Sequence, residues 1–139
     1  MGEIRQTIEL ENYVDRYLFE EGKIEEVKIR RIFLDALVDT GSTMLVLPQD
    51  AIEKLGLKKI RNVIVTYADE RKEERDVAGG IIIQIGDRRM NLDAVIGPPN
   101  SEALIGQIVL EGMDLIVDST KQQLKVRPES PFLPLLKLK

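Results

Sequence analysis

The stretch Asp39-Thr40-Gly41-Ser42 combines residue types that could carry out acid–base chemistry. Asp39 offers two carboxylate oxygens, and the hydroxyls of Thr40 and Ser42 can donate to a carboxylate or to the backbone. Gly41 allows a sharp turn and a close approach by another group. Apolar residues precede and follow the stretch, so we expect Asp39 to be buried, either held by donors or kept neutral. A second carboxylate beside it would share one proton with it.

Two residue types are absent from the sequence: cysteine and histidine. Their absence excludes disulfides, cysteine nucleophiles, cysteine/histidine zinc sites and acid–base catalysis by histidine. Proton transfer would therefore depend on Asp, Glu, Lys or Tyr. No stretch has the alternating acidic pattern of a calcium-binding loop, so we expect neither a metal nor another cofactor.

The composition is that of a globular chain. Its 139 residues suit one domain, with 43% hydrophobic and 32% charged residues. The net charge of −4 and the low aromatic content argue against nucleic-acid binding, and only residues 28–31 form a compact basic cluster. No apolar run reaches membrane-spanning length, and the first residues lack an apolar signal region. We expect a cytoplasmic protein that binds neither nucleic acid nor a membrane.

Apolar and alternating runs predict an all-β domain of about nine short strands with one or two short helices, closed or folded over on itself. We expect strands at 4–10, 13–19, 23–33, 44–48, 60–67, 77–86, 89–97, 115–118 and 123–127. Residues 13–19 and 23–33 are predicted to form a hairpin, as are 77–86 and 89–97. Helices are expected at 49–57 and, after Gly106, within 103–113. The charged segment 68–76 is predicted to be a solvated hairpin tip or a mobile flap.

The segment Leu104-Ile105-Gly106 gives the Asp-Thr-Gly triplet a context. "ALVDTGST" followed by "ALIGQIVLEGMDLIVD" resembles the retropepsin-like aspartic proteases, single-domain relatives of pepsin found in retroviruses and as free-standing prokaryotic proteins. The resemblance covers residues 24–127. It implies a single-domain, retropepsin-like closed β-barrel or sandwich over residues 1–127 that functions as a two-fold homodimer. Residues 128–139 would form a tail, which we expect to be irregular because it holds three of the six prolines.

The same resemblance implies roles for individual residues. Asp39 would be the catalytic residue, in a loop supported by Thr40, Gly41 and Ser42. The Thr40 side chain would bond across the subunit interface, and Ser42 would bond the catalytic carboxylate. The second loop of a psi-shaped motif would consist of Leu104, Ile105 and Gly106. The flap and substrate contacts would come from Tyr67, Ala68, Asp69, Glu70 and Arg71, and the pocket residues would be Leu37 and Leu104.

Two positions depart from the pattern of the family. After the second glycine, members often have Arg or another residue, where this chain has Gln107, and then Asp or Asn, where it has Ile108. The hydrogen bonds that the Asp or Asn side chain makes must therefore be absent or replaced here. Flap tips are often rich in glycine, whereas this chain has Glu70 there. A bulky residue at a turn that prefers glycine would hinder flap closure.

Only one Asp-Thr-Gly occurs in the sequence. Asp114 and Asp118 lack the turn context, and we interpret them as surface or strand-end residues. The partner of Asp39 would therefore be Asp39 of a second copy, brought close by a two-fold axis.

We interpret the chain as a homodimeric aspartic endopeptidase that acts on a peptide or protein. The alternative is a catalytically weak or inactive dimeric module of the same fold that binds peptides or proteins. A third interpretation, a small-ligand β-barrel, would make the triplet a chance match. The tail at 128–139 could complete a dimer sheet, occupy a neighbour's cleft or be disordered, and the sequence does not identify the substrate.

Overall fold

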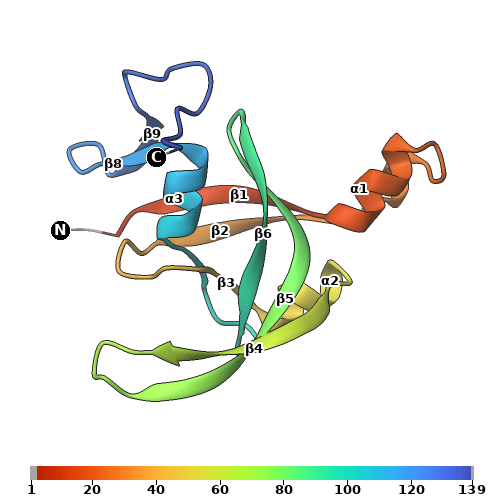
Figure 1. The fold of residues 1–139 in the computed structure, drawn as a ribbon, viewed down its shortest axis with the longest axis horizontal. Helices are drawn as coiled ribbons and strands as arrows, with labels where there is room; N and C mark the ends of the chain where they lie inside the picture. Colours follow the sequence, from red (N-terminus) through yellow and green to blue (C-terminus); the bar gives the residue numbers. More distant parts are fainter. Residues whose placement is uncertain (1–2, 139) are drawn as a thin grey trace.

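The computed structural model describes residues 3–138, which form mostly β-structure with a few short helices (Figure 1). The strands are β1 (Arg5–Asn12), β2 (Arg31–Val38), β3 (Leu45–Pro48), β4 (Lys58–Thr66), β5 (Lys72–Ile85), β6 (Arg88–Gly97), β7 (Ala103–Ile105), β8 (Leu115–Asp118) and β9 (Gln123–Val126). The α-helices are α1 (Tyr13–Glu20), α2 (Gln49–Lys54) and α3 (Gln107–Met113), with a 3-10 helix at Glu26–Lys28.

Strand β1 closes the barrel because it pairs with two strands at once. The sheet runs in the order β1-β2-β7-β3-β6-β5, and β1 also pairs antiparallel with β5, from Glu9 opposite Gln84 to Asn12 opposite Ile81. These six strands form a closed ring, which confirms the predicted β-barrel. Strand β4 pairs only with the outer part of β5, while β8 and β9 form a separate two-stranded sheet.

The core lies inside this ring and follows the alternation of the strands. Ile8 and Leu10 of β1 and Ile81 and Ile83 of β5 are each fully buried. Side chains two apart point to the same face of a strand, so the inward positions of these strands meet in one cluster. Burial of each such side chain contributes about 1.5–3 kcal/mol. The core therefore fixes the barrel whose ends carry the loops described below.

The predicted hairpin of residues 13–19 and 23–33 is wrong, because residues 13–20 form helix α1. The side chain of Asn12 caps the helix by accepting the Asp15 N–H at 3.0 Å. The Asp15 carboxylate in turn accepts the backbone N–H of Arg30 at 2.9 Å and its side-chain Nε at 2.8 Å. These bonds fix the helix against the returning chain. Residues 3–138 thus contain three α-helices instead of the one or two expected.

Most other predicted elements are confirmed. Helix α2, the β5–β6 hairpin and α3 after Gly106 lie where the sequence places them. The connector between β4 and β5 is shorter than the expected charged segment 68–76, because residues 72–76 already belong to β5. Strand β9 ends at Val126, and residues 127–138 contain neither helix nor strand. The predicted domain boundary after residue 127 stays a prediction. No helix within residues 3–138 has the length and apolarity needed to cross a membrane.

Candidate active site around Asp39

Asp39 directly follows β2 and lies beside the end of β7. The two strands are parallel, with Leu37 opposite Leu104 and Val38 opposite Ile105. The backbone N–H of Asp39 donates to the carbonyl of Ile105 at 2.9 Å. The structure therefore brings the Asp-Thr-Gly triplet and the predicted second loop together.

The turn at residues 39–42 holds Asp39 by backbone donors. The Gly41 N–H donates to the Asp39 carboxylate at 3.0 Å, and the Ser42 N–H donates to the Asp39 carbonyl at 3.0 Å. The Ser42 hydroxyl donates to the carbonyl of Met44 at 3.1 Å. The resemblance implied that the Ser42 hydroxyl bonds the Asp39 carboxylate. In the single chain it bonds the Met44 carbonyl instead and so stabilises the loop.

Gly106 is required by the crossing of the two loops. A Cβ added there would lie 2.6 Å from the carbonyl oxygen of Ser42 and 2.7 Å from that of Met44. Beside it, the Gln107 N–H donates to the Ser42 carbonyl at 2.8 Å, and the Ile108 N–H donates to the Thr43 carbonyl at 2.9 Å. The start of α3 thus binds the backbone of the Asp39 loop directly.

The departure at Gln107 has a structural consequence. Its side-chain Nε2 donates to the carbonyl of Thr40 at 2.9 Å. Ile108, at the next position, has no polar side-chain atoms and is 42% exposed. Gln107 therefore supplies a side-chain hydrogen bond to the backbone of the Asp39 loop, which the apolar side chain of Ile108 cannot do.

The expected burial of Asp39 is wrong for the single chain. Asp39 is only half-buried, and Thr40 and Gly41 are exposed. Leu37 and Leu104, the predicted pocket residues, are also half-buried. The reason is positional: the loop leaves the barrel at the end of β2, so the packed interior covers one side of it and no other segment of the described chain covers the rest.

Residues 67–71 form the tip of the long β4–β5 hairpin, which extends away from the barrel (Figure 1). The Glu70 N–H donates to the Tyr67 carbonyl at 2.9 Å, and the Tyr67 N–H donates to the Arg71 carbonyl at 2.8 Å. Glu70 has a φ of +67°, the left-handed conformation that favours glycine in such three-residue loops. The Asp69 carboxylate accepts the Arg71 N–H at 3.0 Å, while Ala68 is exposed. The site's predicted flap residues therefore share one tip, which makes no hydrogen bond with the Asp39 loop in the described chain.

Side chains also brace this hairpin tip. The Tyr67 hydroxyl donates to the Glu73 carboxylate at 2.8 Å, and the Arg71 guanidinium lies 4.5 Å from the centre of the Tyr67 ring. The Tyr67 hydroxyl, followed by the charges of Arg75 and Arg71, lowers the pKa of the Glu73 carboxyl. These side-chain contacts stabilise the exposed tip of the hairpin.

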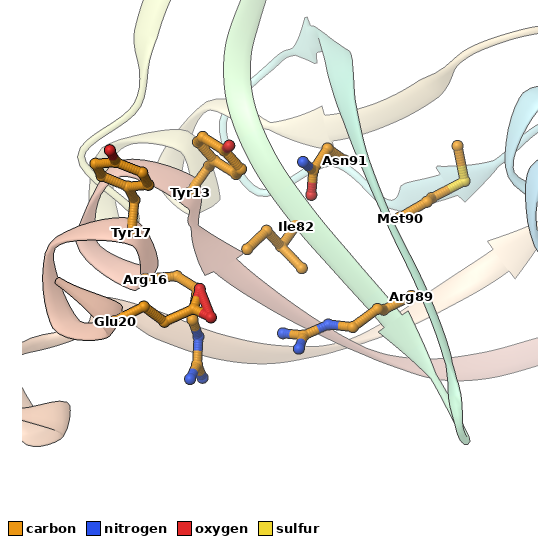
Figure 2. A pocket seen from close by; sticks show the side chains of 8 residues that line it. All are labelled: Tyr13, Arg16, Tyr17, Glu20, Ile82, Arg89, Met90 and Asn91. Atoms are coloured by element: carbon orange, nitrogen blue, oxygen red, sulfur yellow. The ribbon is translucent and has the colours of Figure 1, made fainter.

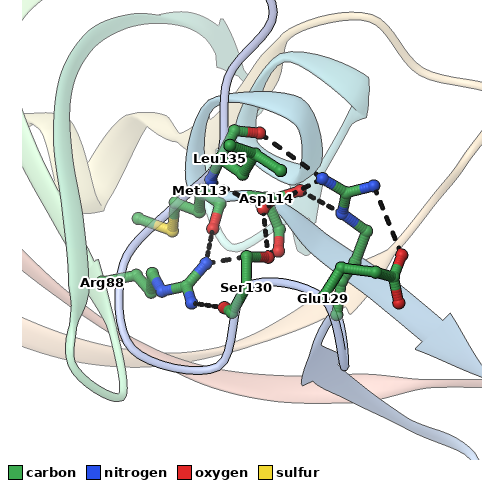
Figure 3. Close-up of polar contacts among 7 residues, drawn as sticks. Arg88, Met113, Asp114, Glu129, Ser130 and Leu135 are labelled. Atoms are coloured by element: carbon green, nitrogen blue, oxygen red, sulfur yellow. Dashed lines mark hydrogen bonds and ion pairs between the residues drawn. The ribbon is translucent and has the colours of Figure 1, made fainter.

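Asp114 was predicted to be a surface or strand-end residue, and this is wrong. It lies in the left-handed conformation at the end of α3 and is 8% exposed. Its carboxylate accepts the Arg127 Nε at 2.5 Å, the Ser130 hydroxyl at 2.5 Å and the Leu135 N–H at 2.8 Å (Figure 3). The Ser130 hydroxyl first, and Arg127 and the Leu135 N–H after it, lower the pKa of this carboxyl to about 2.

Arg88 completes this polar cluster from the other side. Its guanidinium is buried and donates to the carbonyls of Met113 at 2.8 Å and Ser130 at 2.5 Å (Figure 3). We call the group of Arg88, Asp114, Arg127 and Ser130 the tail clasp, because it fixes the chain after β9 to the end of α3. By contrast, Asp118 does end a strand, as predicted, and accepts the N–H groups of Thr120 and Lys121 at 3.1 Å each.

Two cavities lie away from the Asp39 carboxylate. One, of about 370 Å³, lies between α1 and the β5–β6 hairpin (Figure 2) and is lined by Tyr13, Arg16, Tyr17, Glu20, Ile82, Arg89, Met90 and Asn91. The other, of about 460 Å³, is lined by Tyr13, Met44, Arg61, Gly80, Ile81, Met90, Asn91, Leu92, Asp93 and Ile108. Beside the first cavity, the buried carboxylate of Glu11 pairs with Arg16 at 2.6 Å and with Arg89 at 3.4 Å. Neither cavity contains Asp39, so neither encloses the predicted chemistry.

The described residues contain no cluster of metal-ligating side chains. No three acidic side chains between residues 3 and 138 come close enough together to hold an ion. What the loop around Asp39 offers chemically is one positioned carboxylate with free acceptor capacity.

A comparison with known protein families identifies the family of the chain. A family model described as aspartyl protease matches residues 22–109, more than half of the chain. The matched range includes the Asp39 loop, the β4–β5 hairpin and the segment at Gly106, whereas β1, α1 and the tail clasp's Asp114 lie outside it. No curated protein matches the chain significantly.

Proposed function

The chain belongs to the retropepsin-like aspartyl protease family, and we propose that it is an aspartic endopeptidase whose active site is assembled from two copies. One observation carries the proposal. Asp39 is fixed by backbone bonds at the surface of the chain, half-buried, with one donor to its carboxylate in the described residues. Such a carboxylate is available to a second carboxylate, to water and to substrate.

The dimer follows from the chemistry. A closed pair of identical chains uses the same surface twice, so a residue near the two-fold axis meets its own counterpart. The exposed tip of the Asp39 loop, at Thr40 and Gly41, would lie at this axis. Covering it with a second copy would also provide the dry surroundings that the single chain lacks.

In the proposed reaction, one Asp39 is ionised and its counterpart carries a proton. Two adjacent carboxylates cannot both ionise cheaply, so the pair holds one proton in mildly acidic solution. The ionised Asp39 takes a proton from a water between them, and that water attacks the peptide carbonyl carbon. The protonated Asp39 donates to the carbonyl oxygen, and the proton then reaches the leaving nitrogen as the C–N bond breaks.

The substrate would lie extended across the dimer. Leu37 and Leu104 are paired in register on neighbouring parallel strands beside Asp39 and would form an apolar wall. The β4–β5 hairpin of each chain would cover the substrate with residues 67–71. The preferred substrate is therefore a peptide with apolar side chains next to the cut, and no cofactor takes part.

A weak or inactive peptide-binding module is the second candidate. Glu70 favours it, because its left-handed backbone at the flap tip costs about 1–2 kcal/mol that glycine would avoid. The bond from Gln107 to Thr40 weighs against it, since this bond supports the Asp39 loop. A statine-type transition-state mimic should block hydrolysis by the peptidase and chelators should not, whereas the module would show no hydrolysis to block. The cytoplasmic location and the absence of nucleic-acid and membrane partners stay predictions.

Mixed dimers test the proposal. Wild-type and Asp39→Asn chains are refolded together at a fixed total concentration, and initial rates are measured across the mixing series. If the mixed dimer is inactive, activity follows the square of the wild-type fraction, so an equal mixture keeps roughly a quarter of the full rate. A straight line through zero would mean that each chain works alone, and the dimeric mechanism would be wrong.

A further inference from the structure

Helix α1 is attached to the barrel by polar contacts and leaves its aromatic rings exposed. It lies outside the range that the family model matches. Among its residues only Asp15 is buried, whereas Tyr13 is 40% exposed and Tyr17 is 51% exposed. A surface helix normally packs its apolar stripe on the core. The two rings of α1 are therefore available to another molecule.

The two cavities described above join into one groove along the β5–β6 hairpin. Both are lined by Tyr13, Met90 and Asn91, so the cavity beside α1 continues into the second one. In the first cavity, the rings of Tyr13 and Tyr17 lie on one side of the space and the Arg89 guanidinium lies on the other (Figure 2). We call this continuous space the α1 groove.

The far end of the α1 groove reaches the loops that hold Asp39. Met44 and Ile108 line its second cavity. The carbonyl of Met44 accepts the Ser42 hydroxyl at 3.1 Å, and the N–H of Ile108 donates to the Thr43 carbonyl at 2.9 Å. Both residues therefore belong to the crossing loops that position Asp39. A polypeptide that leaves the proposed cleft past these residues can continue into the groove.

The groove passes over a β-bulge that leaves open space. Between the pairs Ala78–Ala94 and Ile81–Leu92, two residues of β5 face one residue of β6. One of the two is Gly80, which has a φ of +81° and lines the second cavity. A Cβ added there would meet nothing within 4 Å in the described chain. An extended chain lying in the groove therefore meets no side chain at this position.

Arg89 gives the groove a positive charge that the fold neutralises incompletely. The buried carboxylate of Glu11 pairs with Arg16 and with Arg31 at 2.6 Å each, but with Arg89 only at 3.4 Å. Arg31 also pairs with Glu9, at 3.1 Å. Of the three guanidinium groups around Glu11, that of Arg89 has the longest contact, and its side chain is half-exposed. Arg89 can therefore donate to a carboxylate of another molecule.

The remaining charges of the groove place a preference for acidic groups near α1. In the second cavity, Arg61 and Asp93 carry opposite charges, and in the first, Glu20 lies at the end of α1. Beside Arg89 lie the two tyrosine rings and Met90, whose thioether adapts to different apolar partners. A carboxylate next to an aromatic or aliphatic side chain matches this arrangement.

We propose, on the basis of the proposed peptidase function, that the α1 groove binds a segment of the protein substrate that lies beyond the cleft. The segment is extended and carries an acidic residue beside an aromatic or aliphatic one. Its carboxylate pairs with Arg89, and its apolar side chain packs on Tyr13 and Tyr17. Binding there lowers KM for long substrates and leaves kcat unchanged, because the groove does not touch the bond that breaks.

Three reporter peptides test the groove. All share one apolar sequence around the cut. The second adds, through a flexible glycine–serine linker, a segment of alternating Asp and Phe, and the third has Lys in place of Asp. Because each copy carries one groove, the segment is placed at either end, with linkers of increasing length.

We expect KM for the acidic peptide to be at least about fivefold lower than KM for the short peptide, because the linker makes the second contact intramolecular. The kcat values should be equal, and the lysine peptide should gain nothing. Equal KM for all three peptides at every linker length would overturn the groove. An equal gain for the lysine peptide would overturn the pairing with Arg89.

Matched variants locate the site. Tyr17→Ala and Arg89→Gln should each raise KM for the acidic peptide at least about threefold, and KM for the short peptide should stay the same. Val14→Ala, at a 56% exposed position of α1 that lines neither cavity, and the exposed Lys121→Gln should keep wild-type KM for both. Glu20→Gln removes a negative charge from the first cavity and should lower KM for the acidic peptide. Loss of activity on the short peptide in Tyr17→Ala would show that α1 supports the fold and would overturn its role in binding.

A binding measurement separates the two proposals. The segment of alternating Asp and Phe, carrying a fluorophore, is titrated with Asp39→Asn protein, and its anisotropy is followed. We expect saturable binding that Arg89→Gln weakens in the same background. Hydrolysis of the short peptide by wild type, without binding of the segment, overturns the groove while the peptidase stands. Binding without hydrolysis of any peptide by wild type contradicts the peptidase function and leaves the groove as the site of a binding module.

Discussion

Asp39 and Asp114 are two carboxylates of one chain in opposite surroundings. The buried Asp114 carboxylate accepts bonds from Arg127, Ser130 and Leu135. The half-buried Asp39 carboxylate accepts one bond in the described chain, from the Gly41 N–H. One carboxylate is saturated by its own chain, and the other keeps free acceptor sites at the surface.

Under the proposed function, this difference separates a structural carboxylate from the one that would react. Any new partner of Asp114 would have to displace a charge-assisted hydrogen bond, which is costly in a buried site. Asp39 is positioned through its backbone, by the Ile105 carbonyl and the Ser42 N–H, so its side chain can take part in chemistry without breaking the fold. Four substitutions, one of them also followed across pH, test this contrast.

Asp39→Asn should have the largest effect. We expect kcat/KM to fall at least about 10³-fold, because the ionisable group is lost. The amide oxygen can still accept the Gly41 N–H, so the midpoint of thermal unfolding should stay unchanged. Peptidase rates and melting curves on the same preparation measure both. Wild-type activity in the variant would end the assignment of Asp39 as the reactive carboxylate.

Gly106→Ala should come next. The new methyl group would lie 2.6 Å from the Ser42 carbonyl oxygen, so the Asp39 loop must shift. A displacement of about 1 Å can cost roughly 10²-fold in rate. Gly22→Ala, where the added methyl group meets nothing within 4 Å but the φ of +75° strains an alanine, is the control for backbone strain far from the site and should keep full activity per folded molecule. Equal activity of the two variants would show that loop crossing does not position Asp39.

Asp114→Asn should affect stability and spare catalysis. Asparagine tolerates the left-handed backbone found there, at φ 56°, so the change removes mainly the charge paired with Arg127. We expect the unfolding midpoint to fall by on the order of 5 °C. The exposed turn variant Asp87→Asn is the control. A drop in the rate per folded molecule, at unchanged stability, would reverse the contrast.

The stability effect of Asp114→Asn should depend on pH. The Asp114 carboxyl has its pKa lowered from 3.8 to about 2, mainly by the Ser130 hydroxyl. A lowered pKa in the folded state means that the stabilisation is complete above the ordinary value and is lost as pH falls toward the folded one. The difference in unfolding midpoint between wild type and variant should therefore be constant above about pH 5 and shrink between about pH 4 and 2. Growth of the difference on acidification would contradict the assignment.

Gln107→Ala should have the smallest effect. It removes one neutral hydrogen bond to the Thr40 carbonyl, a contribution of about 0.5–1.5 kcal/mol, and we expect activity to fall by roughly threefold. Gln84→Ala removes a comparable bond, to the Gly86 carbonyl, away from Asp39 and should leave activity unchanged. Identical rates for both variants would show that the Gln107 bond is dispensable for the site.

The sequence by itself determined the parts of the molecule that depend on local patterns. Alternating apolar residues predict most strands of the barrel, though not β7, and helical spacing after Gly106 predicts α3. Part of the Asp-Thr-Gly turn is also local, since the bonds from the N–H groups of Gly41 and Ser42 to Asp39 join residues three or fewer apart. These features need no knowledge of distant neighbours.

The tertiary structure alone decided what depends on residues far apart in the chain. The run at 13–19 fits both strand and helix spacing, and the bond from Arg30 to the Asp15 carboxylate favours the helix. Asp114 becomes buried only because Arg88, Ser130 and the tail converge on the end of α3, with Arg88 and Ser130 separated by 42 residues. Exposure of Asp39 follows from where β2 leaves the barrel. Neighbouring residues determine the hydrophobic periodicity of a segment. The burial of a side chain and the hydrogen-bond donors around it depend on which distant segments the fold brings together.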